Sequence, residues 1–207
     1  MRIILLGPPG AGKGTQGQAL ATLHGVPHIA TGDIIRDHIA RHTEFGRRVE
    51  AAIAAGNFVA DEDILYWVSV RLAEPDAQAG YLLDGFPRDV AQAEAFDQIP
   101  DAVVDLEIAE SALVERLAGR MVCPVCGTVY HDQHHPPKRA GFCDKEGAKL
   151  VRRPDDAPDA VRHRLQVYRD QTAPLQAYYE HRGLLRRIDA LGAPEVVTKR
   201  IQDALAK

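Results

Sequence analysis

Short apolar runs alternate with longer amphipathic stretches over most of the 207-residue chain. The apolar runs have the length and composition of buried strands, and helical patterns lie between them. Such an alternation is typical of a parallel sheet that helices cover on both faces. We therefore predict an α/β fold with strands at residues 2–6, 27–29, 81–83, 103–108 and 184–188.

The amphipathic stretches predict the helices that cover this sheet. The first helix is expected at residues 16–24 and the last at residues 194–205. Residues 30–70 predict several short helices with a break at residues 56–57, where Gly and Asn follow each other. Another helix is expected from near residue 111 to residue 120, before a segment with few large apolar side chains.

The glycine-rich segment of residues 7–15, with the sequence GPPGAGKGT, carries the most specific chemistry. It follows the first predicted strand and leads into the first predicted helix, which is the context of a phosphate-binding loop. Its backbone N–H groups and the helix dipole attract anionic oxygens. Lys13 adds a mobile positive charge for the outer phosphates. A glycine-rich turn without a ligand is the alternative, which the flanking strand and helix disfavour.

One position departs from the usual phosphate-binding loop. Gly14 follows the lysine, where a serine or threonine usually ligates Mg²⁺, and the hydroxyl of Thr15 comes one residue later. We therefore expect the metal to be held more by nucleotide and water than by this loop.

Composition limits the class of protein. Hydrophobic residues make up 45% and charged residues 26%, which fits a globular domain with small insertions. The net charge of −4 argues against a nucleic-acid partner. No apolar run approaches the ~20 residues of a membrane-spanning helix, and no signal peptide precedes the first strand. We expect a cytoplasmic protein with no membrane partner and, since no coiled-coil pattern occurs, a monomer.

A second specific stretch is YLLDGFPR at residues 81–88. Asp84 ends an apolar strand, so its carboxylate is expected at the carboxyl edge of the sheet, where phosphoryl transfer needs a metal-organising group. Gly85 and Pro87 shape a tight turn that presents Arg88. Gln92 follows on an expected helix, and its amide can make two hydrogen bonds to a nucleobase edge. An exposed helix residue is the alternative for Gln92 alone.

Two arginines close the expected helix of residues 111–120. Arg116 and Arg120 are four residues apart, so they would share one face of that helix. Beside a phosphate loop, such a pair suggests an anion clamp, and two solvated charges are the alternative. Arg36 considered alone is also better explained as a solvated charge.

The chain resembles the adenylate kinase family nearly end to end. The motifs that carry the resemblance are residues 7–15, 31–33 and 84–88, together with Gln92. The resemblance implies a P-loop NTPase-type core of residues 1–29, 60–118 and 157–207. It also implies an AMP-binding insertion at residues 30–59 and a lid at residues 119–156. The implied reaction is reversible phosphoryl transfer, ATP + AMP = 2 ADP, with Mg²⁺ bound to ATP and a role in adenine nucleotide homeostasis.

The resemblance also implies the site residues. Expected ATP contacts are Gly10, Ala11, Gly12, Lys13, Gly14, Thr15, Arg116, Arg120, Val129, Tyr130 and Ala193, the last of which replaces a lysine often found there. Expected AMP contacts are Thr31, Arg36, the backbone of Asn57, Phe58 and Val59, then Gly85, Phe86, Pro87, Arg88, Gln92, Arg153 and Arg164. The expected catalytic group is Lys13, Asp84, Arg88, Arg120, Arg153, Asp155, Asp156 and Arg164.

All three cysteines, Cys123, Cys126 and Cys143, lie in the expected lid. C-x₂-C with a second knuckle farther along has the spacing of a zinc site, and Glu146 occupies the fourth position. Asp144 and the nearby histidines are less favoured fourth ligands. Zinc would be structural here, because the segment lacks the apolar side chains for a core of its own. Free thiols in a lid held by hydrogen bonds are the alternative.

Two other functions are compatible with part of these features. A kinase for UMP, CMP or another nucleotide would share the loop and the arginines, but Thr31 and Gln92 favour AMP. A zinc-containing nucleotide-binding regulator or nucleic-acid module without catalysis would need neither the complete arginine set nor the acidic net charge.

Overall fold

The computed structural model describes residues 1–206 and has a five-stranded sheet at its centre. The strand order is β2-β3-β1-β4-β7, and every neighbouring pair is parallel. The predicted α/β fold is confirmed, and each predicted strand agrees with an observed one to within one residue at either end. The strands are β1 Arg2–Leu6, β2 His28–Ala30, β3 Tyr81–Asp84, β4 Ala102–Glu107 and β7 Leu185–Asp189.

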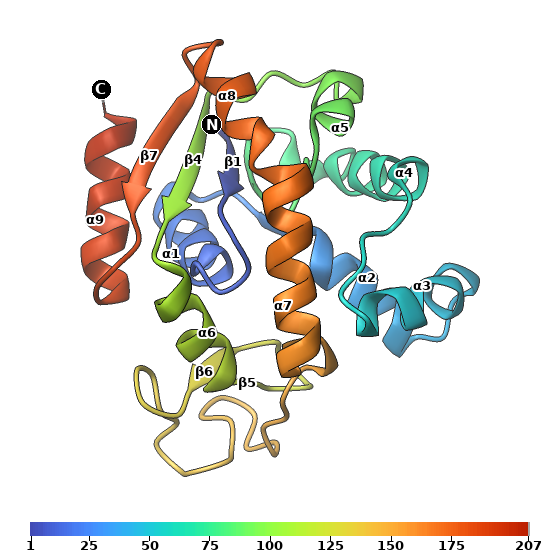
Figure 1. Cartoon of the computed structure of the whole chain (residues 1–207), viewed down its shortest axis with the longest axis vertical. Coiled ribbons are helices and arrows are strands. Elements are labelled where there is room, and N and C mark those ends of the chain that lie inside the picture. The colour runs from blue at the N-terminus through green and yellow to red at the C-terminus, as the bar shows by residue number, and fades with distance from the viewer. Residues whose placement is uncertain (207) are drawn as a thin grey trace.

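Helices cover both faces of the sheet (Figure 1). They are α1 Lys13–His24, α2 Thr31–Ala40, α3 Glu44–Ala54, α4 Asp61–Leu72, α5 Val90–Ala95, α6 Glu110–Ala118, α7 Pro158–Val167, α8 Pro174–Glu180 and α9 Pro194–Leu205. Short 3₁₀ turns at Pro75–Ala77 and Pro154–Asp156 and a π-helical turn at Tyr168–Thr172 complete the set. Among the described residues, no helix has both the length and the apolar character needed to cross a membrane.

Burial explains why the strands are almost continuously apolar. Along β1, Ile4 and Leu6 pack into one core cluster, whereas Ile3 and Leu5 pack into a second cluster. Successive side chains of a strand point to opposite faces, so the two clusters lie on the two sides of the sheet. Both faces are buried, as expected for a parallel sheet between helical layers.

A small antiparallel sheet lies apart from the central one. Strand β5, Arg120–Val122, pairs with β6, Val129–His131. This hairpin is the base of the segment at the bottom of Figure 1, while α2 and α3 lie to the right of α7. The hairpin was not predicted, because three-residue strands are too short to show an alternating pattern. The predicted helix through residue 120 is therefore wrong at its end, since α6 stops at Ala118.

Candidate phosphate-binding site

The loop after β1 folds into a concavity of backbone N–H groups. Gly7, Gly10 and Gly12 adopt φ values of 135°, 88° and 98°, which side chains with a Cβ rarely adopt. Helix α1 begins at Lys13, three residues earlier than predicted. The first three N–H groups of a helix have no intrahelical partner, so those of residues 13–15 remain available to an anion.

Lys13 lies inside this loop. Its Nζ donates to the carbonyl oxygens of Gly7 at 2.7 Å and Pro8 at 3.1 Å. Burial, together with the positive charges of Arg164, Arg88 and Arg120, lowers the pKa of Lys13 from 10.5 to about 8, although the negative charge of Asp84 opposes this shift. The loop therefore holds a positive charge that an anion would stabilise.

Asp84 lies at the carboxyl end of β3, beside this loop. Its side chain is 13% exposed, and Oδ2 is 3.7 Å from Nε2 of His28. Burial favours the neutral carboxyl, but the neighbouring imidazole of His28 and the charge of Lys13 hold the pKa of Asp84 below its usual range. A Cβ on Gly14 would lie 3.9 Å from this Oδ2, so the ionised carboxylate lies at the start of α1. No sequence motif pointed to His28.

Five arginines surround the same region, and burial together with the charges of neighbouring arginines lowers the pKa values of Arg88, Arg153 and Arg164. Burial, with the charges of Arg164 and Arg36, lowers the pKa of Arg88 to about 10. Burial, with the charges of Arg36 and Arg120, lowers the pKa of Arg153 to about 10. The structure thus brings together predicted residues from distant parts of the sequence, and it leaves the group with an excess of positive charge.

Two aspartates neutralise part of this charge. Asp156, 4% exposed, accepts two hydrogen bonds from Arg120, one of them from Nε at 2.8 Å. Asp155 accepts from Arg164 at 2.7 Å. Both aspartates come from the 3₁₀ turn before α7, so this turn orients the two guanidinium groups. The predicted acidic pair therefore lies among the predicted arginines.

Arg116 does not share a helix face with Arg120, contrary to the prediction, because Arg120 belongs to β5. Arg116 instead donates to the carbonyl oxygens of Ala190 at 2.9 Å and Ala11 at 3.3 Å. It thus links the phosphate loop to the loop after β7. Ala193 lies in that second loop, where it is exposed and precedes α9.

Several residues predicted to contact AMP are engaged within the protein. Thr31 is fully buried and its hydroxyl donates to Gly85 O at 2.9 Å. Gln92 is 1% exposed. Its Oε1 accepts from Arg88 N at 2.8 Å and its Nε2 donates to Asp61 at 2.6 Å. Gln92 is therefore not an exposed helix residue, and its amide keeps one N–H and one lone pair for a base.

Residues 57–59 and 86–87 offer mainly backbone groups. The side chain of Asn57 accepts from His163 Nε2 at 2.7 Å, which draws this segment toward α7. Val59 is buried, and Phe86 is fully buried in the core, followed by a cis peptide bond to Pro87. The Phe58 ring instead lies against the guanidinium of Arg88. Neither His163 nor this ring contact was predicted.

Tyr130 was predicted to contact ATP, but its side chain is 2% exposed in the small core of the 119–156 segment. Its hydroxyl accepts from Asp144 N at 2.9 Å. The side chain of neighbouring Val129 is only partly buried. The aromatic ring is part of the packing beneath the cysteines.

The three cysteines form a cluster that suits a tetrahedral metal. Their sulfur atoms all lie within 4.8 Å of one another, and Sγ of Cys126 is 3.6 Å from Sγ of Cys143. Zinc bonds of about 2.3 Å would place two sulfurs about 3.8 Å apart in a tetrahedron. Burial favours the thiol of Cys143, but hydrogen bonds from Tyr130 and two backbone N–H groups lower its pKa to about 6.

The fourth ligand is not in place. Glu146 contributes a backbone N–H to Cys143, but its exposed carboxylate is not among the ligand atoms gathered within 4.8 Å. Asp144 and the histidines, considered over residues 1–206, also lie outside that cluster. Glu146 would have to change its side-chain conformation to complete the site.

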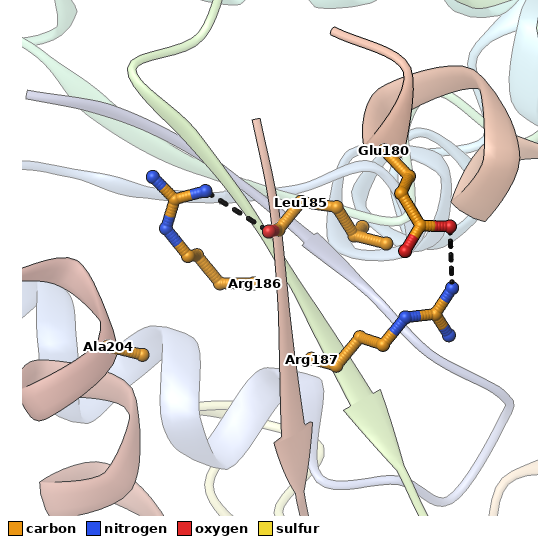
Figure 2. Close-up of a pocket in the computed structure, with 5 residues that line it drawn as sticks. All are labelled: Glu180, Leu185, Arg186, Arg187 and Ala204. Carbon is orange, nitrogen blue, oxygen red and sulfur yellow. Dashed lines mark hydrogen bonds and ion pairs between the residues drawn. The ribbon is translucent and has the colours of Figure 1, made fainter. Parts of the chain in front are cut away.

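A separate cavity of about 420 Å³ lies at the edge strand β7 (Figure 2). Glu180, Leu185, Arg186, Arg187 and Ala204 line it, and Arg187 pairs with Glu180 at 3.1 Å. It contains none of the predicted site residues. The predicted site is thus a set of converging polar groups rather than this cavity.

Comparisons with known proteins agree with this geometry. A family model described as "Adenylate kinase" matches residues 5–184. Curated relatives of the same name include that of Moorella thermoacetica, 49% identical over 214 residues, which cover 100% of this chain and 99% of that protein. Those of Anaeromyxobacter sp. strain Fw109-5 and Streptomyces avermitilis are 48% and 47% identical, over 97% and 100% of this chain and 99% and 98% of theirs.

Proposed function

The chain belongs to the adenylate kinase family, and we propose that its arginine-lined site transfers the terminal phosphoryl group of ATP to AMP, giving two ADP. The observation that supports this assignment of the site is the convergence of Arg88, Arg120 and Arg164 on Lys13, whose pKa is lowered by burial and by the charges of these three arginines. Such an excess of positive charge suits two polyphosphate ligands bound side by side.

The chemistry requires alignment and positive charge more than covalent catalysis. In phosphoryl transfer, negative charge spreads over the equatorial oxygens of the moving group, and guanidinium forks bind such oxygens well. No general base is needed, because the acceptor is already a phosphate oxygen. Mg²⁺ bound with ATP supplies charge neutralisation of the phosphates, and Asp84 is the residue that would hold it, through water.

We propose that the residues of the site are distributed among three domains. The core comprises residues 1–29, 60–118 and 157–207, the AMP-binding insertion residues 30–59, and the lid residues 119–156. Water is the competing acceptor, so closure of the lid and the insertion would exclude it and assemble the arginines together. Helix α3 of the insertion contacts the 3₁₀ turn Pro154–Asp156, which lies at the end of the proposed lid. These contacts support an approach of the insertion toward the lid.

The alternative kinases, for UMP, CMP or another nucleotide, differ from the proposed one in the monophosphate that accepts the phosphoryl group. Gln92 is held by Arg88 and Asp61, so its remaining N–H and lone pair have a fixed direction. A fixed amide suits one base edge, and we propose adenine rather than a pyrimidine.

An assay of ATP with AMP, UMP, CMP and GMP in turn tests this choice. We expect ADP formation with AMP to exceed that with each other monophosphate by at least about tenfold in kcat/KM, because a buried amide rejects a mismatched base. A higher rate with UMP or CMP would move the protein to the alternative kinases. No transfer to any acceptor by folded protein would favour a non-catalytic regulator.

We further propose that Cys123, Cys126, Cys143 and Glu146 hold a structural Zn²⁺ in the lid. The sulfur separation of 3.6 Å supports the metal, and Glu146 supports the fourth position because it lies beside Cys143 in the second knuckle. Zinc would then supply the cross-link that the small core of this segment lacks.

Elemental analysis under reducing conditions is the test of this site. We expect about one zinc per chain in the wild type, weaker retention against a chelator in Glu146→Ala, and none in Cys143→Ser. Lys145→Ala is the matched control and should retain the wild-type zinc content. A metal-free wild type would contradict the proposed zinc, and unaltered retention by Glu146→Ala would exclude that residue as the ligand.

We also propose that the protein is a cytoplasmic monomer. The three cysteines are free thiols, which suits a reducing compartment. The proposed site draws all its residues from one chain, so catalysis requires no second subunit.

A further inference from the structure

Arg88 is held in a fixed orientation by three contacts, two of which involve its guanidinium. Its Nε donates to Gly85 O at 2.8 Å, and the backbone N–H of the same residue donates to Gln92 Oε1 at 2.8 Å. The third contact is the ring of Phe58, whose centroid lies 4.5 Å from Cζ of Arg88. This distance is within the range of a cation–π interaction.

These contacts leave the phosphate-binding edge of Arg88 free. Within residues 1–206, its two terminal nitrogens have no hydrogen-bond or ion-pair partner. The planar fork formed by these nitrogens matches two oxygens of a phosphate group. Arg88 is therefore presented with one edge bound, one face covered and one edge open.

The charge around Arg88 explains why an aromatic ring is useful there. Burial and the nearby Arg164 and Arg36 destabilise its positive charge. A carboxylate in contact with the guanidinium would relieve this repulsion, but it would also occupy the fork and compete with phosphate. The negative face of a phenylalanine ring stabilises the cation without using any N–H group.

We propose that Phe58 is a positioning residue, which orients Arg88 toward the phosphate of AMP through its ring face. The inference rests on the proposed AMP site, to which it adds a side-chain role where only a backbone contact was expected. Because Phe58 acts through Arg88, its effect should be confined to the monophosphate site and should depend on the phosphate rather than the base.

A double-mutant cycle measured by calorimetry tests this role. Phe58→Leu keeps an apolar side chain but removes the ring face, so the Kd for AMP should rise by about 3- to 30-fold. Phe58→Tyr keeps the ring face and should restore the wild-type Kd. In an Arg88→Met background, Phe58→Leu should change the Kd for AMP by less than about twofold.

Two further measurements separate positioning from a general structural effect. The Kd for ATP and the urea midpoint should be the same in Phe58→Leu as in the wild type. Adenosine, measured by competition, should bind Phe58→Leu as it binds the wild type, since it lacks the phosphate. An equal loss of adenosine binding would show that the ring contacts the base, and it would overturn the inference.

The remaining outcomes distinguish this inference from the proposed function. If the wild type binds AMP but Phe58→Leu binds it equally well, or loses the same affinity in the Arg88→Met background, Phe58 is not a positioning residue. If the wild type does not bind AMP, the proposed function fails first, and the inference fails with it.

Discussion

At the scale of single residues, Lys13 shows how burial prepares a site for an anion. Its ammonium lies within the phosphate loop and donates to two carbonyl oxygens. The negative charge of Asp84 offsets part of the positive charge of the nearby arginines. Burial and these arginines lower its pKa to about 8 in the free protein. Bound phosphates would favour the charged form and raise this pKa again.

This difference in pKa predicts that ATP binding depends on pH. The protein takes up a proton when ATP binds between the free and the bound pKa, so affinity is full below about pH 8 and falls as pH rises above it. Between the free and the bound pKa of Lys13, the Kd for ATP should rise by up to about tenfold per pH unit. Calorimetry at pH 8.5 in two buffers of different ionisation enthalpy measures the uptake. Lys13→Arg, which does not titrate there, should show none, and equal uptake by this variant would contradict the assignment.

At the scale of elements, helices α2 and α3 meet at a position that only glycine can occupy. A Cβ on Gly46 would lie 2.1 Å from the carbonyl oxygen of His38 and 2.7 Å from the nitrogen of Ile39. Both are backbone atoms, so no side-chain rotation can relieve the contact. Thr43 caps α3 through the N–H of this same glycine, at 3.0 Å, which fixes the start of the helix at the crossing.

Gly46→Ala therefore distinguishes packing from helix propensity. Propensity alone predicts a gain of about 1 kcal/mol in the free energy of unfolding, because alanine is the better helix former. The close approach instead predicts a net loss of about 1–3 kcal/mol. Urea unfolding measures the difference, and Glu50→Ala on the exposed face of the same helix should change stability by less than about 0.5 kcal/mol. A Gly46→Ala protein as stable as the wild type would refute this packing.

The strands could be predicted from the sequence, whereas one helix end was missed and several turn contacts could not be predicted. The strands were predictable because both faces are buried, which leaves unbroken apolar runs such as residues 3–6. The end of α6 was missed although Gly119, the C-cap residue, is a helix stop signal. That Arg120 then joins a strand is decided only by its pairing with His131. The turn contacts of Thr31 and Gln92 were not predictable either, since their partners lie 54 and 31 residues away.

At the scale of the whole molecule, the site exists only because distant segments converge. Arg88 follows β3, Arg120 begins the small sheet, and Arg164 lies on α7. The sequence motifs named these residues, but the pairing of Arg120 with Asp156 and of Arg164 with Asp155 depends on the fold. Side-chain directions, such as those of buried Tyr130 and exposed Glu146, also required the packed structure.

At this scale the proposed function requires that the terminal phosphoryl group passes from ATP to AMP rather than to water. Incubation of the protein with ATP labelled at its γ-phosphate and with unlabelled AMP follows that group directly. We predict that the label appears in the β-phosphate of ADP, with two ADP formed for each ATP consumed and little labelled inorganic phosphate. Label released as inorganic phosphate, or ATP left unchanged by folded protein, would contradict the central claim.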